Sequence, residues 1–121
     1  TGARADRALL VNADLRDSRA VGALFHQADL RRANAAGADL AFANLTFARL
    51  QGALLTGANL TAAHLGDARL QEADLAGANL DAADLGGAQM PGAFLSRARL
   101  RDAQMVGCLL DHAYLGKADL S

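Results

Sequence analysis

The sequence predicts an all-β solenoid, in which the chain coils around one axis and turns a corner every five residues. Of the 24 positions whose number leaves remainder 3 on division by five, 22 are alanine, and the other two are Ser18 and Cys108. Of the 24 multiples of five, 18 are leucine, and the rest are Ala5, Ala20, Phe25, Ala35, Met90 and Met105. We call these positions the core alanine column and the core leucine column.

A period of five fits neither a regular helix nor a flat strand. On an α-helix, five residues advance about 500°, so the leucines would drift around the helix by about 140° per repeat. On a flat strand, successive leucines would alternate between the two faces. Neither column contains a charged residue, although 21% of the chain is charged. We therefore expect two columns to face inward and three to face solvent.

The expected interior consists of large residues from the leucine column and small residues from the alanine column. Each buried leucine contributes about 1.5–3 kcal/mol of stability. The alanine column must stay small, because overpacking a narrow interior costs about 1–3 kcal/mol per site. The predicted core residues are Leu40, Leu45, Leu50, Leu55, Leu60, Leu65, Leu70, Leu75, Leu80, Leu85, Ala58 and Ala78.

The other three columns predict corners. We call them the outer column (remainder 4), the first corner column (remainder 1) and the second corner column (remainder 2). All 12 glycines lie in the corner columns, nine in the second and three in the first, where their permissive backbone angles are useful. Ten outer positions are Asp or Asn, whose side chains readily bond nearby backbone groups at turns.

Segments such as Ala38-Asp39-Leu40-Ala41-Phe42 and Ala73-Asp74-Leu75-Ala76-Gly77 give a specific resemblance. The chain resembles the pentapeptide repeat family, whose motif reads small residue, Asp or Asn, Leu or Phe, polar residue, Gly. The resemblance covers essentially all 121 residues as 24 in-phase units. It implies a right-handed quadrilateral β-helix with 20 residues per coil, and hence about six coils.

We expect residues 1–121 to form a single domain of this kind. The first residue is Thr1 and not Met, which indicates that the chain is processed, trimmed or excised from something longer. The chain has no segment apolar enough to cross a bilayer and no signal-peptide pattern, and its single cysteine allows no internal disulfide. The cytoplasm is therefore the default compartment, and no membrane association is expected.

The charge balance bears on the function. The chain has 12 basic and 13 acidic residues, and with 20 residues per coil no face is strongly one-signed. Some bacterial members of the family protect type II topoisomerases by imitating duplex DNA, which requires an acidic surface. The sequence offers no acidic run and no inserted loop. We therefore expect a non-enzymatic protein-binding or scaffold module, and a gyrase-binding DNA mimic that confers inhibitor or toxin resistance is the alternative.

Two groups of outward residues are candidate contact surfaces. Phe94 and Tyr114 are 20 residues apart and should stack, and with Leu109 they form the predicted interface of a homodimer through the C-terminal coils. The cluster Arg31, Arg32, Arg49 and Arg69 lies beside Asp29 and Glu72, which is typical of a solvated face with compensating acids. Direct nucleic-acid binding is not expected there, because aromatic residues for base stacking are missing.

No catalytic residue, metal site or cofactor is expected. His26 and His64 fall two coils apart on one face and His112 lies on another, whereas a metal needs ligands that converge on one ion. Cys108 is in an inward column, so its sulfur cannot meet a substrate with His112 as the base. A straight, filled rod is also expected to offer no pocket of ligand size.

Overall fold

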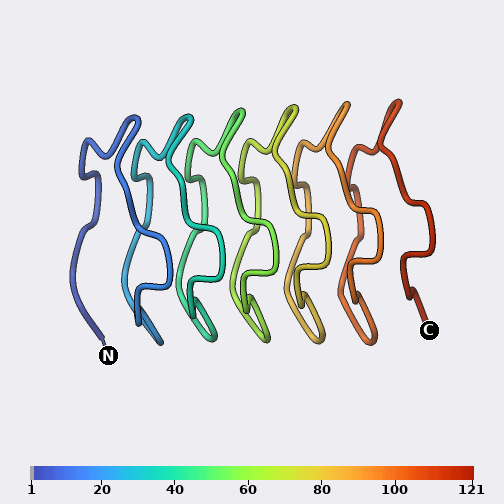
Figure 1. Ribbon diagram of the computed structural model, residues 1–121, viewed down its shortest axis with the longest axis horizontal. Helices are drawn as coiled ribbons and strands as arrows, with labels where there is room; N and C mark the ends of the chain where they lie inside the picture. The colour runs from blue at the N-terminus through green and yellow to red at the C-terminus, as the bar shows by residue number, and fades with distance from the viewer. Residues whose placement is uncertain (1) are drawn as a thin grey trace.

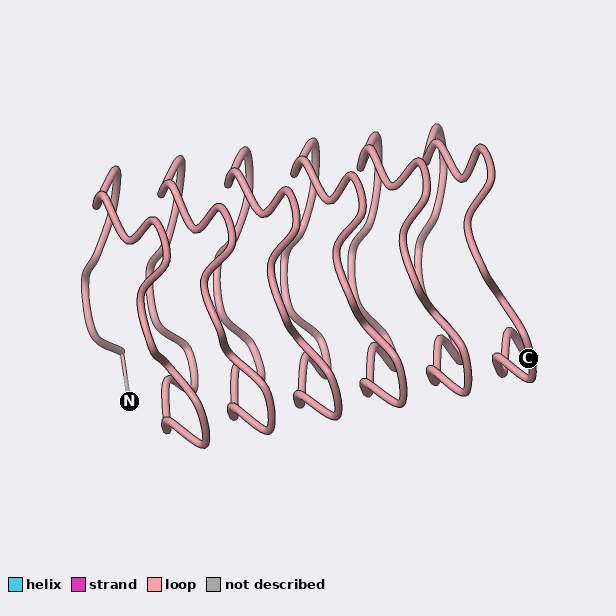
Figure 2. Cartoon of the chain, turned by 45° about the horizontal axis from the view of Figure 1, so that its top comes forward, coloured by secondary structure: helices cyan, strands magenta, loops and turns pink. Residues whose placement is uncertain are grey.

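The computed structural model describes residues 2–121, which form the right-handed quadrilateral β-helix that the sequence predicts. Figure 1 shows similar coils stacked along one axis, with the two termini at opposite ends of the rod. Residues 2–121 contain no helix, and their β-structure consists of isolated bridge residues, so no strand has bounds to report. Figure 2 accordingly draws residues 2–121 as loops and turns.

The register of the rod is 20 residues. Every bridge is parallel and joins an outer-column residue to the residue 20 positions later, from Arg4 with Leu24 to Arg99 with Asp119. Residues 20 apart therefore lie above one another, and five-residue units divide each coil into four sides. The number of coils, about six, stays a prediction from the chain length.

The four sides are defined by their outer residues. Side 1 carries Arg4, Leu24, Asn44, His64, Asp84 and Gln104. Side 2 carries Leu9, Asp29, Arg49, Arg69, Gln89 and Leu109. Side 3 carries Asp14, Asn34, Leu54, Asp74, Phe94 and Tyr114. Side 4 carries Arg19, Asp39, Asn59, Asn79, Arg99 and Asp119.

The backbone hydrogen bonds repeat with every unit, as the unit around Leu45 shows. The Asn44 N–H donates to the carbonyl of Ala23 in the coil before, at 2.9 Å. The N–H groups of Leu45 and Phe47 donate to carbonyls in the coil after, at 2.7 and 3.0 Å. The Ala48 N–H closes the corner by donating to the Leu45 carbonyl at 2.9 Å. Four of the five amides in a unit are thus paired by the backbone alone.

The fifth amide belongs to the first corner column, and the Asp and Asn residues of the outer column bond it. At all ten such positions the side-chain oxygen accepts the N–H two residues later, at 3.0–3.4 Å. The same side chain occupies the outer surface and leaves the core columns untouched. The frequency of Asp and Asn in this column is therefore explained by turn formation.

Every corner bends at the second corner column. All its residues have φ between 52° and 72°, whether glycine or not, and together with the closing hydrogen bond this is typical of type II turns. Glycine adopts this conformation without steric cost. The glycines of the first corner column, Gly66, Gly86 and Gly116, do not have positive φ, so the permissive backbone angles of glycine are used only in the second corner column.

The core is a filled stack of the two inward columns. From Ala23 to Leu100 the residues of both columns are buried, and Leu45, Leu60, Leu75 and Leu95 are among the largest side chains that are fully enclosed. Outside this range the columns are half-buried, except that Ala3 and Leu120 are exposed, because a coil needs a neighbour on each side to enclose it. Burial thus depends on stacking and not on the unit alone.

Substitutions in one unit test this arrangement. Leu60→Asp places an unpaired charge in a fully buried site and should destabilise the rod by about 3–5 kcal/mol. Ala58→Leu overpacks the neighbouring core position and should cost about 1–3 kcal/mol. The exposed control Thr56→Asp should change stability by less than about 0.5 kcal/mol. Urea unfolding followed by circular dichroism measures all three, and unchanged midpoints for both core variants would contradict the inward assignment.

Candidate functional site

The exposed apolar residues gather most clearly on side 3. Phe94 and Tyr114 are 44% and 58% exposed, and their rings stack in parallel with centroids 4.9 Å apart and an interplanar angle of 4°. Leu54 lies two coils before Phe94 in the same column, with Asp74 between them. The stack follows from the parallel bridge that joins the two outer positions. Together the two rings form an exposed aromatic patch.

Leu109 lies on side 2, around one corner from Tyr114. Its side chain is exposed, and its bridge partner is Gln89. Asp111 and His112 occupy the corner between the two sides. The three residues of the predicted interface therefore come from two adjacent sides, and Leu109 does not join the aromatic stack.

Two further aromatic residues occupy strained corner positions. Phe42 and Phe47 have φ of 59°, a conformation in which bulky residues are rare, and they are 61% and 50% exposed. Phe47 meets His26 of the preceding coil edge to face, with ring centroids 5.8 Å apart. Phe47 also occupies the corner that leads into side 2, so the expectation that no aromatic residue accompanies the arginine cluster is wrong.

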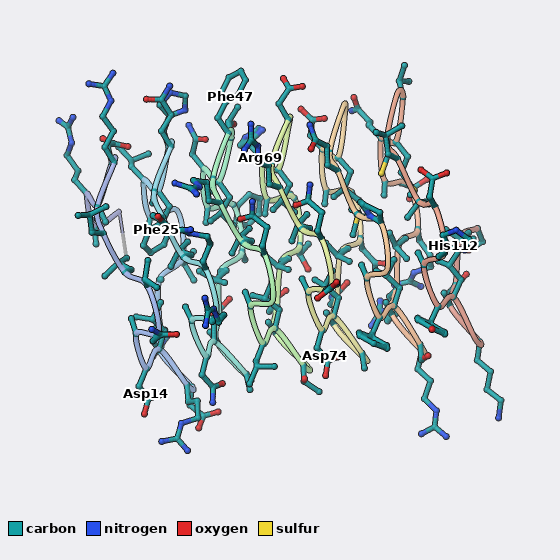
Figure 3. All side chains as sticks on the ribbon, turned by 90° about the horizontal axis from the view of Figure 1, so that it is seen from above. Asp14, Phe25, Phe47, Arg69, Asp74 and His112 are labelled. Atoms are coloured by element: carbon teal, nitrogen blue, oxygen red, sulfur yellow. The ribbon has the colours of Figure 1, made fainter. Side chains whose placement is uncertain are left out.

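The arginine cluster occupies side 2 and the corner after it. We call Arg31, Arg32, Arg49 and Arg69 the basic strip. Figure 3 places Phe47 and Arg69 along one edge of the rod and Asp14 and Asp74 along the other. Asp29 is the buried acidic residue of this region and accepts a bidentate pair of hydrogen bonds from Arg31 at 2.8 and 2.7 Å.

Arg49 lies on the other side of the same carboxylate. Its NH1 is 3.4 Å from the Asp29 Oδ2 atom. The hydrogen bonds from Arg31, with the charge of Arg49 nearby, hold the pKa of Asp29 below its usual range despite the opposing effect of burial. Asp29 therefore stays ionised near neutral pH and neutralises one arginine of the strip.

A groove lies at the corner between sides 2 and 3. It has a volume of about 350 Å³, is open to solvent, and is lined by Arg32, Gln51, Gly52, Gln71 and Glu72. Gly52 stands between Arg32 and Glu72 in the second corner column, so its missing side chain leaves a notch. The rod thus carries a groove open to solvent at this corner, and not an enclosed pocket.

Other carboxylates form local ion pairs. Arg16 binds Asp14 through two hydrogen bonds of 2.9 and 2.7 Å, which lower the pKa of Asp14 to about 2. On side 4, Asp81 accepts hydrogen bonds from both Arg99 and Arg101. Acidic side chains are thus distributed among arginines, and none of the four sides is continuously acidic within residues 2–121.

The groups with potential chemistry lie apart. Within residues 2–121, no three His, Cys, Asp or Glu side chains converge as a metal site would require. Cys108 is half-buried in the core alanine column, and burial raises the pKa of its thiol. A raised thiol pKa leaves less of the nucleophilic thiolate at neutral pH. In the same described part of the chain, no helix has the length and apolar character to span a bilayer.

The geometry defines a class: a four-sided β-helix of five-residue units with one large and one small inward residue in each. A family model described as pentapeptide repeats matches the chain over residues 8–46, 38–77, 58–97 and 78–116. The chain belongs to the pentapeptide repeat family.

Solved structures of the same family are similar to this chain. The pentapeptide repeat protein Rfr23 from the cyanobacterium Cyanothece 51142 is 33% identical, with a TM-score of 0.76 over 77% of this chain and 64% of that chain. A pentapeptide repeat protein from the thylakoid lumen of Arabidopsis thaliana is 29% identical, with a TM-score of 0.76 over 78% of this chain and 66% of that chain. The aligned region spans just under two thirds of the length of each.

A third likeness extends to the fold alone. Trypsin-treated QnrB1, a plasmid-mediated fluoroquinolone resistance protein, is 20% identical, with a TM-score of 0.65 over 97% of this chain and 71% of that chain. No curated protein sequence matches the chain.

The ion pairs of Asp29 predict a pH-dependent stability. Asp29→Asn keeps an oxygen for the Arg31 amide and removes the charge that Arg31 and Arg49 contact. Because the folded-state pKa is depressed, the stabilisation is present above the unfolded pKa of about 3.9 and is lost as the pH falls through the folded value. We expect the variant to be less stable by about 1 kcal/mol at pH 7 and by a smaller amount at pH 2.

Asp74→Asn is the matched control, since Asp74 bonds the amide of Ala76 and forms no ion pair with the described residues. Urea unfolding at both pH values measures the difference. A loss for Asp29→Asn that is the same at both pH values, or the same as that of Asp74→Asn, would show that the charge does not contribute.

Proposed function

We propose that this rod is a non-enzymatic protein-binding module, and that one of its partners is a second copy of the chain bound through side 3 and the adjoining part of side 2. The observation that carries the proposal is the exposed stack of Phe94 and Tyr114. Aromatic pairs of this kind contribute about 0.5–1.5 kcal/mol beyond their buried area, and such residues are enriched at interfaces. Leu109 extends the apolar surface around the corner.

Binding, and not catalysis, is also what the remaining side chains support. The inward columns fill the core, the outer Asp and Asn residues bond turn amides, and several carboxylates are paired with arginines. Each side is built from short, rigid backbone segments fixed by inter-coil hydrogen bonds. Such sides can present side chains at a fixed spacing of roughly 4.8 Å along the rod.

A gyrase-directed DNA mimic remains the competing function. Imitation of duplex DNA requires negative charge along a backbone-like path. Side 2 carries the basic strip, and Asp29 and Asp81 are each held between two arginines. Among residues 2–121 the acidic side chains form no continuous line along one side, and the likeness to QnrB1 extends to the fold alone.

The proposed interface predicts the effect of a charge on side 3. Light scattering should give twice the chain mass of 12.5 kDa at high protein concentration, and Tyr114→Arg should shift the protein to monomer. Phe42→Arg is the matched control, because Phe42 is equally exposed but occupies the corner between sides 4 and 1. A monomer at every concentration would exclude the second copy as the partner, and equal behaviour of the two variants would exclude side 3 as its interface.

A gyrase supercoiling assay with and without a fluoroquinolone distinguishes the two functions. We expect no effect of the rod on supercoiling or on poisoning. Protection or inhibition at low micromolar rod concentration would replace the scaffold function with DNA mimicry.

A further inference from the structure

We propose that side 2, from the Phe47 corner to the notch at Gly52, binds a short acidic peptide segment of a partner protein that carries an apolar residue beside its carboxylates. The proposal rests on the proposed function, because it names the chemistry of a partner for a protein-binding rod. It concerns a different surface from the aromatic stack of side 3.

The first argument is unbalanced positive charge. Arg32 and Arg69 are exposed, and neither forms an ion pair or a side-chain hydrogen bond with any residue in the described range 2–121. Asp29 neutralises one guanidinium at most, and Arg31 already holds it at 2.7 Å. The four arginines of the strip outnumber the acidic residues beside them, Asp29, Asp67 and Glu72, so the surface keeps a small net positive charge that attracts the carboxylates of a partner.

The second argument is a set of unmet hydrogen bonds at the same place. Three buried side-chain atoms in residues 2–121 have no partner, and they are Arg49 Nε, Gln51 Oε1 and Gln71 Oε1. Gln51 and Gln71 line the groove, and Arg49 immediately precedes it on side 2. A buried polar atom without a partner costs stability, so the clustering of all three at one corner calls for an explanation.

These three atoms are shielded from solvent in the free rod, so a peptide bonds them only when the half-buried side chains of Arg49, Gln51 and Gln71 turn toward the groove. The amide of Gln71 is oriented by its Nε2 atom, which donates to Gln89 Oε1 at 3.0 Å and leaves its own Oε1 as an acceptor. The two glutamine oxygens accept N–H groups, and Arg49 Nε donates to a carbonyl or carboxylate oxygen. An extended peptide supplies donors and acceptors in alternation along one edge.

The apolar part of the proposed peptide is placed by Phe47. This side chain is half-exposed at the corner that leads into side 2, and its ring meets the ring of His26 edge to face. An apolar residue packed on Phe47 has its neighbouring carboxylates within the reach of Arg49 and Arg69. Glu72 at the far wall of the groove limits how far an acidic segment extends in that direction.

A nucleic acid fits this surface less well. A phosphate backbone brings a dense and continuous negative charge, which meets Glu72 in the groove and Asp29 within the strip. Binding of single strands relies on successive aromatic side chains for base stacking. Among the described residues, side 2 and its corners offer only Phe47 for this purpose.

The test uses a fluorescein-labelled synthetic peptide of glutamates with one central leucine, titrated with the rod and followed by fluorescence anisotropy. We expect saturable binding that weakens as the NaCl concentration rises. Arg69→Glu should weaken it about tenfold or more, whereas Arg97→Glu, the same charge change at the corner between sides 3 and 4, should weaken it by less than about threefold. Gln71→Leu, which leaves the net charge unchanged, should weaken binding by several fold.

Thermal unfolding of each variant verifies that the rod is intact. Equal affinities of the Arg69→Glu and Arg97→Glu variants would overturn the proposal, as would tighter binding of a fluorescein-labelled oligonucleotide, single-stranded or duplex, than of the peptide. A lysine peptide of the same length should not bind.

If the acidic peptide fails to bind while Tyr114→Arg still converts a dimer to monomer, this proposal falls and the protein-binding function stands. If the protein binds the peptide but is monomeric at every concentration, the peptide site on side 2 is supported and only the second copy is excluded as a partner.

Discussion

The inter-coil hydrogen bond is the interaction on which every other feature of the rod depends. Each five-residue unit sends one amide to the coil before it and two to the coil after it, and a fourth amide closes the corner. This pattern requires the backbone to return to the same position after 20 residues. The return is possible only if each corner bends through a positive φ, which all residues of the second corner column adopt. Core packing then follows, because the outer residue of each unit faces solvent and its two neighbours face the axis.

The same constraint leaves the surface free to vary. Backbone pairing uses no side chain, and the core uses two of every five residues, so the outer and corner columns can carry any side chain that tolerates its turn position. Because the coils stack, residues that are 20 positions apart in the sequence lie next to each other on the surface. This is how Phe94 meets Tyr114, how Arg49 comes above Asp29, and how a single glycine between Arg32 and Glu72 becomes a notch. Function in such a rod depends on the order in which side chains follow one another along the axis on each of its four sides.

The fold could be predicted from the sequence because the residues that set its five-residue period, the core alanine and core leucine columns, have no other role. The uncharged alanine and leucine columns fix which positions face inward, and the period of 20 places Phe94 next to Tyr114. The details of the surface could not be predicted in the same way. Asp29 pairs with Arg31 two residues later, whereas Asp81 pairs with Arg99 and Arg101 in the next coil, and this choice depends on side-chain rotamers. The groove at Gly52 and the position of Phe47 beside the basic strip likewise depend on how neighbouring corners stack.

Hydrogen–deuterium exchange of individual amides, measured by NMR, tests the central claim most directly. The account predicts protection with a period of five, in which the amides of Asn44, Leu45, Phe47 and Ala48 exchange slowly and those of the first corner column exchange fastest. Within that column, Thr61 and Ala76, which follow Asn59 and Asp74, should exchange more slowly than Thr56 and Gln71, whose amides have no side-chain acceptor among the described residues. Protection that alternates with a period of two would contradict the account, as would first corner amides that exchange as slowly as the other four amides of each unit.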